Sequence, residues 1–165
     1  REDFVPVRHR KLAFADLALP LAHGETMLKP VLEGRLLQAL DLKPTDDVLQ
    51  IGAGSGFLSA CLARLARAVH ALELHPDLTA EAQRRLDAAE IANVRLECAD
   101  AATWSTGQRF DAILVGGAVA ELPQRFADWL KPSGRLVAVR GQAPVQEAVC
   151  AYAEAAGLRV ESLLE

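Results

Sequence analysis

The chain has no excess of positive charge, no long apolar run and few cysteines. Its 18 lysines and arginines are outnumbered by 22 aspartates and glutamates, so it lacks the basic surface typical of nucleic-acid binding. No apolar stretch approaches the roughly 20 residues that span a bilayer, and the charged opening Arg1-Glu2-Asp3 is unlike a signal peptide. We therefore expect no nucleic acid and no membrane among its partners, and a cytoplasmic location.

The few cysteines argue against two common kinds of site. Cys61, Cys98 and Cys150 lie far apart and without C-x-x-C spacing, which disfavours both a disulfide framework and a zinc site. We expect them to be small core residues. We also expect no metal site, and structural roles for His9, His70 and His75.

The length of 165 residues and the hydrophobic content of 51% fit a single domain with a sizeable core. Residues 1–30 show little periodicity and are broken by proline and glycine, so we expect an irregular arm laid over a core of residues 31–165. Because the first residue is not methionine, we expect both ends to be cut from a longer chain. We expect a monomer.

Strand and helix patterns alternate through the core, as in a parallel sheet whose strands are joined by helical crossovers. A helix is predicted from Val31, with Pro44 as its stop. The pattern then predicts helices at 57–65, 77–89 and 121–130, and strands at 47–51, 68–73, 94–98, 111–115 and 135–139. The expected fold class is α/β, a doubly wound, mostly parallel sheet with helices on both faces. Residues 145–164 fit a helix or a strand by pattern alone.

The stretch from Asp47 to Gly56 has the pattern of a buried strand that runs into a glycine loop (residues 52–56) and then into a helix. The glycines let the backbone turn tightly and approach a ligand without a Cβ in the way, and the first amides of the helix are donors. Ligands of such sheets bind at the carboxyl ends of the strands. The loop therefore predicts a nucleotide-type site, to which four strand ends contribute: the glycine loop, Glu73, Asp100 and Gly116-Gly117.

Two acids refine the kind of ligand. Glu73 lies 17 residues after Gly56, where a carboxylate can accept hydrogen bonds from both hydroxyls of a ribose. Asp100, at the next strand end, suits the exocyclic amine of an adenine. The dinucleotide pattern G-x-G-x-x-G differs from the G-x-G-x-G found here, which is followed by the bulky Phe57. The pattern favours S-adenosylmethionine as cofactor, with a nicotinamide dinucleotide as the alternative.

The arm narrows the assignment. The chain opens with Arg1-Glu2-Asp3-Phe4-Val5-Pro6 and continues with Ala15-Asp16, Leu19-Pro20-Leu21 and His23-Gly24-Glu25-Thr26-Met27-Leu28-Lys29-Pro30. These segments resemble R-x-x-F-V-P, Y-x-D and P-L-P-I-G-x-G-Q-T-I-S-x-P, the opening of the protein-L-isoaspartate O-methyltransferase family. Gln50 to Phe57 is similar to the family's E-I-G-T-G-S-G-Y. The resemblance covers essentially the whole chain and implies a Rossmann-like methyltransferase fold with antiparallel strands over residues 145–164.

The resemblance implies an enzyme that transfers a methyl group from S-adenosylmethionine to isoaspartyl residues of damaged proteins, a protein-repair reaction whose substrates are isoaspartyl peptides or proteins. Together with the strand-end signals, it implies cofactor binding by Gly52, Ala53, Gly54, Ser55, Gly56, Glu73, Leu74, Asp100 and Ala101. On the substrate side we expect His23, Thr26, Leu28, Gly116 and Gly117.

Departures from the family pattern affect the substrate side most. Leu28 occupies the position of the family's active-site serine, so no catalytic residue is firmly assigned, and Thr26 and His23 are the candidates. A carboxylate acceptor is already ionised at neutral pH, so the protein must supply alignment more than a general base. Two alternatives stay open: a cofactor-binding or regulatory member of the family without isoaspartyl activity, and a methyltransferase with a different acceptor.

Overall fold

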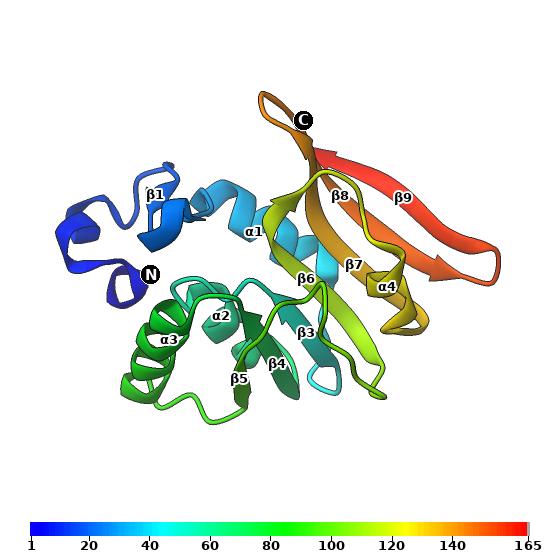
Figure 1. The fold of residues 1–165 in the computed structure, drawn as a ribbon, viewed down its shortest axis with the longest axis horizontal. Helices are drawn as coiled ribbons and strands as arrows, with labels where there is room; N and C mark the ends of the chain where they lie inside the picture. The colour runs from blue at the N-terminus through cyan, green and yellow to red at the C-terminus, as the bar shows by residue number, and fades with distance from the viewer. Residues whose placement is uncertain (165) are drawn as a thin grey trace.

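The computed structural model describes residues 1–164, which fold around one large sheet (Figure 1). Its strands are β3 Asp47–Ile51, β4 Ala68–Glu73, β5 Val94–Cys98, β6 Phe110–Val119, β7 Leu130–Gln142, β8 Val145–Glu154 and β9 Gly157–Leu164. The seven strands lie in the order β5-β4-β3-β6-β7-β8-β9. Neighbours from β5 to β7 are parallel, and β8 and β9 are added antiparallel. The predicted α/β sheet and its antiparallel carboxyl-terminal strands are confirmed.

Helices cover both faces of the sheet. They are α1 Pro30–Leu40, α2 Phe57–Leu65, α3 Pro76–Ala88 and α4 Gln124–Asp128. Side chains alternate between the faces of a strand, so Val48 of β3 packs in one core cluster with Leu62 of α2, and Leu49 packs in another with Phe126 of α4. Burial on both faces explains why the central strands are continuous apolar runs in the sequence. Within residues 1–164, no helix is long and apolar enough to cross a membrane.

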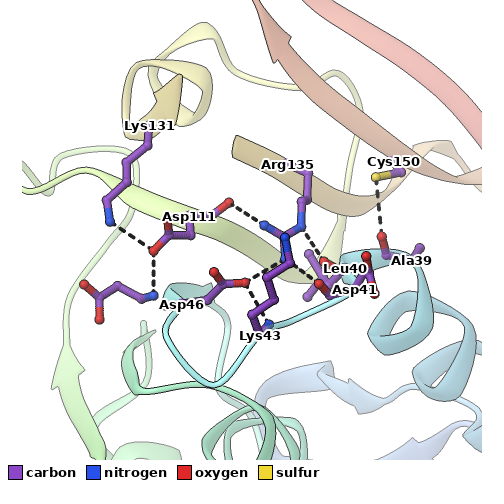
Figure 2. Close-up of polar contacts among 10 residues, drawn as sticks. Ala39, Leu40, Asp41, Lys43, Asp46, Asp111, Lys131, Arg135 and Cys150 are labelled. Carbon is purple, nitrogen blue, oxygen red and sulfur yellow. Dashed lines mark hydrogen bonds and ion pairs between the residues drawn. The ribbon is translucent and has the colours of Figure 1, made fainter. Parts of the chain in front are cut away.

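Pro44 is not what ends α1, contrary to the prediction. Asp41 follows the helix in a left-handed conformation with φ of 44°. Arg135 of β7 then donates hydrogen bonds to the carbonyl oxygens of Leu40 and Asp41 and to the carboxylate of Asp46 (Figure 2). The final carbonyls of a helix need such partners, and here the partner comes from the far end of the chain.

Several boundaries differ from the sequence pattern. β6 extends past the expected end at residue 115, and β7 begins at Leu130 instead of 135. The pairing of these two strands shifts register twice, between Phe110 and Ala112 and between Leu114 and Ala118. Such bulges let irregular segments remain in a sheet, so turn-like residues there belong to strands. The helix expected at 121–130 shortens to 124–128.

Cys98 contradicts the expectation that all the cysteines are core residues. It is exposed, whereas Cys61 is partly buried and Cys150 is buried. Cys98 ends β5, which lies at the edge of the sheet, so among residues 1–164 one side of this strand has no neighbouring strand. The alternation of Val94, Leu96 and Cys98 predicts a strand correctly, but it does not reveal which strand is the edge.

The arm consists of short 3₁₀ turns and a small pair of strands, in agreement with the predicted irregular segment. Its elements are η1 Glu2–Phe4, η2 Val7–Leu12, β1 Leu19–Pro20, η3 Ala22–Gly24 and β2 Thr26–Met27, with β1 and β2 antiparallel. Val5, Leu19 and Met27 form a buried cluster with Leu78 of α3. The arm is therefore packed against the core beside the start of α3.

Candidate functional site

The glycine loop leaves the carboxyl end of β3 and enters α2. The amides of Gly52 and Ala53 donate to the carbonyl oxygen of Leu72 at 2.9 and 3.0 Å, which holds the loop against β4. Gly52 and Gly54 have φ of 84° and 55°, a conformation that costs little only for glycine. A Cβ on Gly54 would lie 3.3 Å from Cδ1 of Leu21. The arm therefore lies directly on the loop.

Glu73 ends β4 beside this loop and is 5% exposed. Its Oε2 accepts a hydrogen bond from the Gly54 amide at 2.8 Å, and its Oε1 accepts one from the His75 amide at 3.1 Å. A carboxylate offers roughly four acceptor positions, so each oxygen keeps a free one. The two amides fix the orientation of the carboxylate and leave it able to accept from two further donors.

A cavity of about 310 Å³ opens at the carboxyl ends of β3, β4 and β6, which is within the size range of small-molecule sites. The arm forms one of its walls and the sheet forms the opposite one. The predicted residues that line it are Thr26, Gly52, Gly54, Glu73, Leu74, Asp100, Ala101, Gly116 and Gly117. Signals from four strand ends and from the arm therefore meet at one place.

Asp100 forms the end of this cavity beyond Glu73. Its residue is exposed, and its Oδ1 accepts a hydrogen bond from the Ala102 amide at 2.8 Å. The preceding amide, that of Ala99, donates to the carbonyl oxygen of Glu73 at 2.9 Å. The two acids are thus joined through the backbone, and the second oxygen of Asp100 can accept a donor from a ligand.

A smaller cavity of about 30 Å³, room for about one water molecule, lies between the glycine loop and the arm. Thr26 and Gly116 line both cavities, whereas Ala53, Ser55 and Leu28 line only the smaller one. Leu28 therefore faces the glycine loop from the arm, and its side chain does not line the larger cavity.

Gly116 and Gly117 lie in the second register shift of β6. A Cβ on Gly116 would come within 2.5 Å of the carbonyl oxygen of Gly52, so only glycine fits at this contact between β6 and the glycine loop. The bulge places bare backbone in the wall of the cavity. Bulges of this kind are common beside functional sites.

Two of the predicted residues lie outside both cavities. Gly56 faces α3, where a Cβ would lie 3.2 Å from the Cβ of Ala82, so its missing side chain serves helix packing. His23 is exposed; its ring stacks on that of His75 at 4.1 Å, and its Nε2 lies 2.7 Å from Oδ1 of Asp77. This hydrogen bond lowers the pKa of Asp77. Both residues therefore fix neighbouring elements instead of lining the cavity.

Several residues of the larger cavity are absent from the sequence prediction. Glu25 lines the cavity, and its Oε1 lies 3.6 Å from Nε2 of His75. Its place beside Thr26 in the arm is the one signal that points to it. The others are apolar and look like core residues in the sequence: Leu21, Ile51, Leu72, Ala99, Val115, Ala118 and Val119.

The arrangement is suited to binding more than to proton transfer. The cavity is lined by the oriented carboxylate of Glu73, by Asp100 and by glycines whose backbone is not covered by a side chain. Among residues 1–164, no group of three or more His, Cys, Asp or Glu side chains is placed to hold a metal ion. A ligand with two neighbouring hydroxyls and an amine matches the acceptors that are present.

Comparison with known proteins finds one family along the chain. The family model described as Protein-L-isoaspartate(D-aspartate) O-methyltransferase (PCMT) matches residues 1–161. Protein-L-isoaspartate O-methyltransferase 1 of Anaeromyxobacter sp. (strain Fw109-5) is 40% identical over 146 residues, covering 87% of this chain and 69% of that protein. Protein-L-isoaspartate O-methyltransferase 2 of Rhodopseudomonas palustris (strain HaA2) is 42% identical over 142 residues, covering 86% and 65%. The chain thus spans about two thirds of the length of these relatives.

Two solved structures share the fold over 100% of this chain. One is a Plasmodium falciparum chain described as a protein-L-isoaspartate O-methyltransferase in complex with S-adenosyl-L-homocysteine; it has a TM-score of 0.82 at 22% identity and is covered over 82% of its length. The other, named protein-L-isoaspartate O-methyltransferase, has a TM-score of 0.85 at 23% identity, with 56% of its length covered. At these identities the likeness establishes the fold.

Proposed function

The chain belongs to the protein-L-isoaspartate(D-aspartate) O-methyltransferase family, and from this premise we propose that it transfers a methyl group from S-adenosylmethionine to the side-chain carboxylate of isoaspartyl residues in damaged proteins. The observation that carries the proposal is the anchored carboxylate of Glu73. The Gly54 and His75 amides orient it at the wall of a cavity that the arm, the glycine loop and β6 enclose. A cofactor with a ribose needs an acceptor of this kind at this strand end.

The residues present fit this cofactor. Glu73 would hold the ribose and Asp100 the adenine, while Gly52 and Gly54 leave backbone where a side chain would fill the space. S-adenosylmethionine supplies, when bound, a methyl group on a positively charged sulfur. Gln50, where this chain departs from the family's glutamate, is fully buried and helps to hold the loop. Its Oε1 accepts a hydrogen bond from Ser59, and its Nε2 donates one to the carbonyl oxygen of Gly52 at 3.5 Å.

The chain's own task at the acceptor is alignment. A free carboxylate has a pKa near 4 and is ionised at neutral pH, so no side chain has to remove a proton from it. Thr26, Gly116 and Gly117 line the cavity at the arm and at β6, where they can orient an acceptor and exclude water. Effective alignment alone can supply a large part of a rate acceleration.

Leu28 favours a second reading of the same site. It offers no hydrogen-bond donor at the family's serine position, and it faces the glycine loop. A family member that binds the cofactor but methylates isoaspartyl residues weakly, or methylates a different acceptor, is the alternative. Replacing Leu28 by serine distinguishes these readings, because a gain in isoaspartyl methylation requires an acceptor site that is otherwise intact.

We further propose that the chain acts as a cytoplasmic monomer, without nucleic acid or membrane as partner, and that residues 1–30 and the core form a single domain. The net charge of −4 supports the absence of a nucleic-acid partner. Cys61, Cys98 and Cys150 are free thiols, which supports a reducing compartment. The shared cluster of the arm and α3 supports a single folded unit.

The first prediction tests the cofactor. In calorimetry the protein should bind S-adenosylmethionine and S-adenosylhomocysteine, and bind NAD much more weakly. Glu73→Ala should weaken binding by about 1–3 kcal/mol, because buried ligand hydroxyls lose their acceptor. Glu97→Ala is the matched control, since Glu97 lies on the neighbouring strand and bonds His70 instead of lining a cavity; it should leave the affinity unchanged. Binding of NAD alone would contradict the proposal.

A further inference from the structure

Arg1 has an unusually buried guanidinium for a residue in an irregular arm, since its side chain is 5% exposed. Its Nη1 donates to the carbonyl oxygen of Ala13 at 2.6 Å and its Nη2 donates to that of Leu28 at 2.7 Å. Its Nε donates to Oε2 of Glu33 at 2.9 Å. Its Cζ also lies 5.6 Å from the centre of the Phe57 ring. One side chain thus contacts four separate segments.

Three of these contacts surround the smaller cavity. Leu28 follows β2, Glu33 lies on α1, and Phe57 is the first residue of α2 after the glycine loop. All three line the cavity of about 30 Å³ between the arm and the loop. Arg1 lies behind them and fixes their relative positions, because a planar guanidinium binds in several directions at once.

Glu33 makes this contact sensitive to substitution. It is 3% exposed. Burial raises the pKa of its carboxyl group more than the hydrogen bond and the positive charge of Arg1 lower it. A buried charge that loses its partner is strongly unfavourable. A lysine at position 1 would keep the charge but could not bond Ala13, Leu28 and Glu33 together, because its donors all lie on one nitrogen, whereas Arg1 uses three separate nitrogens.

We propose that Arg1 is a positioning residue for methyl transfer: through the carbonyl of Leu28 it holds residues 26–28 against the glycine loop and so sets the distance between acceptor and cofactor. This inference rests on the proposed function. It assigns to the first residue of the R-x-x-F-V-P segment a role in the site, although its side chain lines neither cavity.

The expected kinetic effect is specific. Arg1→Lys should lower kcat for an isoaspartyl peptide about ten- to a hundredfold, as small misplacements of reacting groups do, and change the affinity for S-adenosylhomocysteine less than twofold. The gain from Leu28→Ser should disappear in the Arg1→Lys background, because the serine would no longer be held in place. Coupling of this kind is what a double-mutant cycle measures.

Arg135→Lys is the matched control. Arg135 is also a largely buried arginine that bonds backbone carbonyls and a carboxylate, and its side chain is 15% exposed. It lies within β7, among Asp46, Asp111 and the end of α1 (Figure 2). This substitution should lower thermal stability but preserve the gain from Leu28→Ser. Loss of that gain in the control as well would show that any destabilisation removes it, and would overturn the proposal.

Hydrogen exchange of the full chain provides a test that does not depend on activity. Amides of residues 19–28 should exchange faster in Arg1→Lys than in the native protein, whereas those of the glycine loop should not change. If the lysine variant does not fold, Arg1→Gln combined with Glu33→Gln serves the same purpose, because it leaves no unpaired buried charge. Unchanged exchange at residues 19–28 overturns the inference. If exchange at residues 19–28 is faster in Arg1→Lys but the native protein methylates no isoaspartyl peptide, the proposed function is refuted. Arg1 then remains the residue that holds this segment.

Discussion

At the scale of single residues, Leu28 is the position at which this chain departs most from the chemistry its family implies. A serine hydroxyl there could donate to an incoming carboxylate, and a leucine cannot. A hydrogen bond to a charged group contributes about 1.5–3 kcal/mol, and each 1.36 kcal/mol is a factor of about ten in rate. We therefore expect Leu28→Ser to raise isoaspartyl methylation by roughly ten- to more than a hundredfold, measured as transfer of labelled methyl.

Leu28→Ala separates the two effects of this substitution. Alanine also removes bulk beside the cavity of about 30 Å³, but it adds no donor. A gain of the same size with alanine would mean that space limits the reaction and that the hydrogen bond does not. No gain with either residue would favour a different acceptor or a non-catalytic role.

The three cysteines differ in burial, and this difference predicts how fast each thiol reacts. Burial and the nearby Glu33 raise the pKa of the Cys61 thiol to about 11, and burial raises the pKa of Cys150. Thiols react as thiolates, so both should be slow at neutral pH, whereas the exposed Cys98 should react quickly with a thiol-specific disulfide reagent. One fast thiol per chain is expected, and Cys98→Ser should remove it. A fast phase that survives this substitution would contradict the assignment.

Residue types at strand ends predict which residues line the cavity, whereas residue types in the arm predict this much less well. The positions of Glu73 and Gly54 beside the cavity follow from the strand pattern of the sequence, because a parallel sheet brings the ends of its strands together. The position of His23 depends on stacking against His75 and on a hydrogen bond to Asp77, partners more than fifty residues away in sequence. Glu25 was missed for the same reason. No local pattern reports which side of an irregular segment faces a cavity.

At the scale of elements, Asp111 lies at the start of β6 and joins this strand to β3 and β7. Figure 2 shows its contact with Lys131 of β7. Its Oδ2 accepts from the Asp47 amide at 2.8 Å and from Nζ of Lys131 at 3.0 Å. Burial acts to raise its pKa, but the Asp47 amide and the charges of Lys131 and Arg135 outweigh it, so the pKa lies below the ordinary 3.8. The Asp111 carboxylate therefore binds a proton more readily in the unfolded chain than in the folded one.

The sign of the pH dependence follows from that shift. Stability from Asp111 is present above pH 3.8 and is lost as the pH falls through the lower folded pKa. Asp111→Asn should destabilise the protein at pH 7 by about 1 kcal/mol, the scale of a partly exposed charged contact, and the difference should shrink below pH 4. Urea unfolding at both pH values measures it. Asp128→Asn, at an exposed position on α4, is the control and should show no such convergence.

The boundaries of elements were less predictable than their order. The run Asp111 to Val115 has strand character, but β6 continues through Gly116 and Gly117 because it pairs with β7 on both sides of a bulge. Lys131 to Gly134 has the composition of a turn, yet it lies within β7. Register shifts depend on the partner strand, and a single sequence pattern contains no information about the partner.

At the scale of the whole molecule, alternation of strands and helices was enough to predict the doubly wound sheet. Successive side chains of a strand point to opposite faces, so the continuous apolar runs at β3 and β6 indicate a sheet that is covered on both faces. Val48 and Leu49 pack into two different core clusters, as this pattern predicts. The tail was different, because Val145 to Ala156 matched two patterns. Its antiparallel strands β8 and β9 followed only from the resemblance of the whole chain to a family.

The most direct test of the proposed function is transfer of labelled methyl from S-adenosylmethionine to two peptides that differ only in an isoaspartyl or an aspartyl linkage at one position. We expect the native protein to label the isoaspartyl peptide slowly but measurably and the aspartyl peptide not at all, because the proposed cofactor contacts of Glu73 and Asp100 are in place, whereas Leu28 provides no hydrogen-bond donor for the acceptor. Equal labelling of both peptides, or none of either by a protein that binds S-adenosylmethionine, would contradict isoaspartyl methylation as its function.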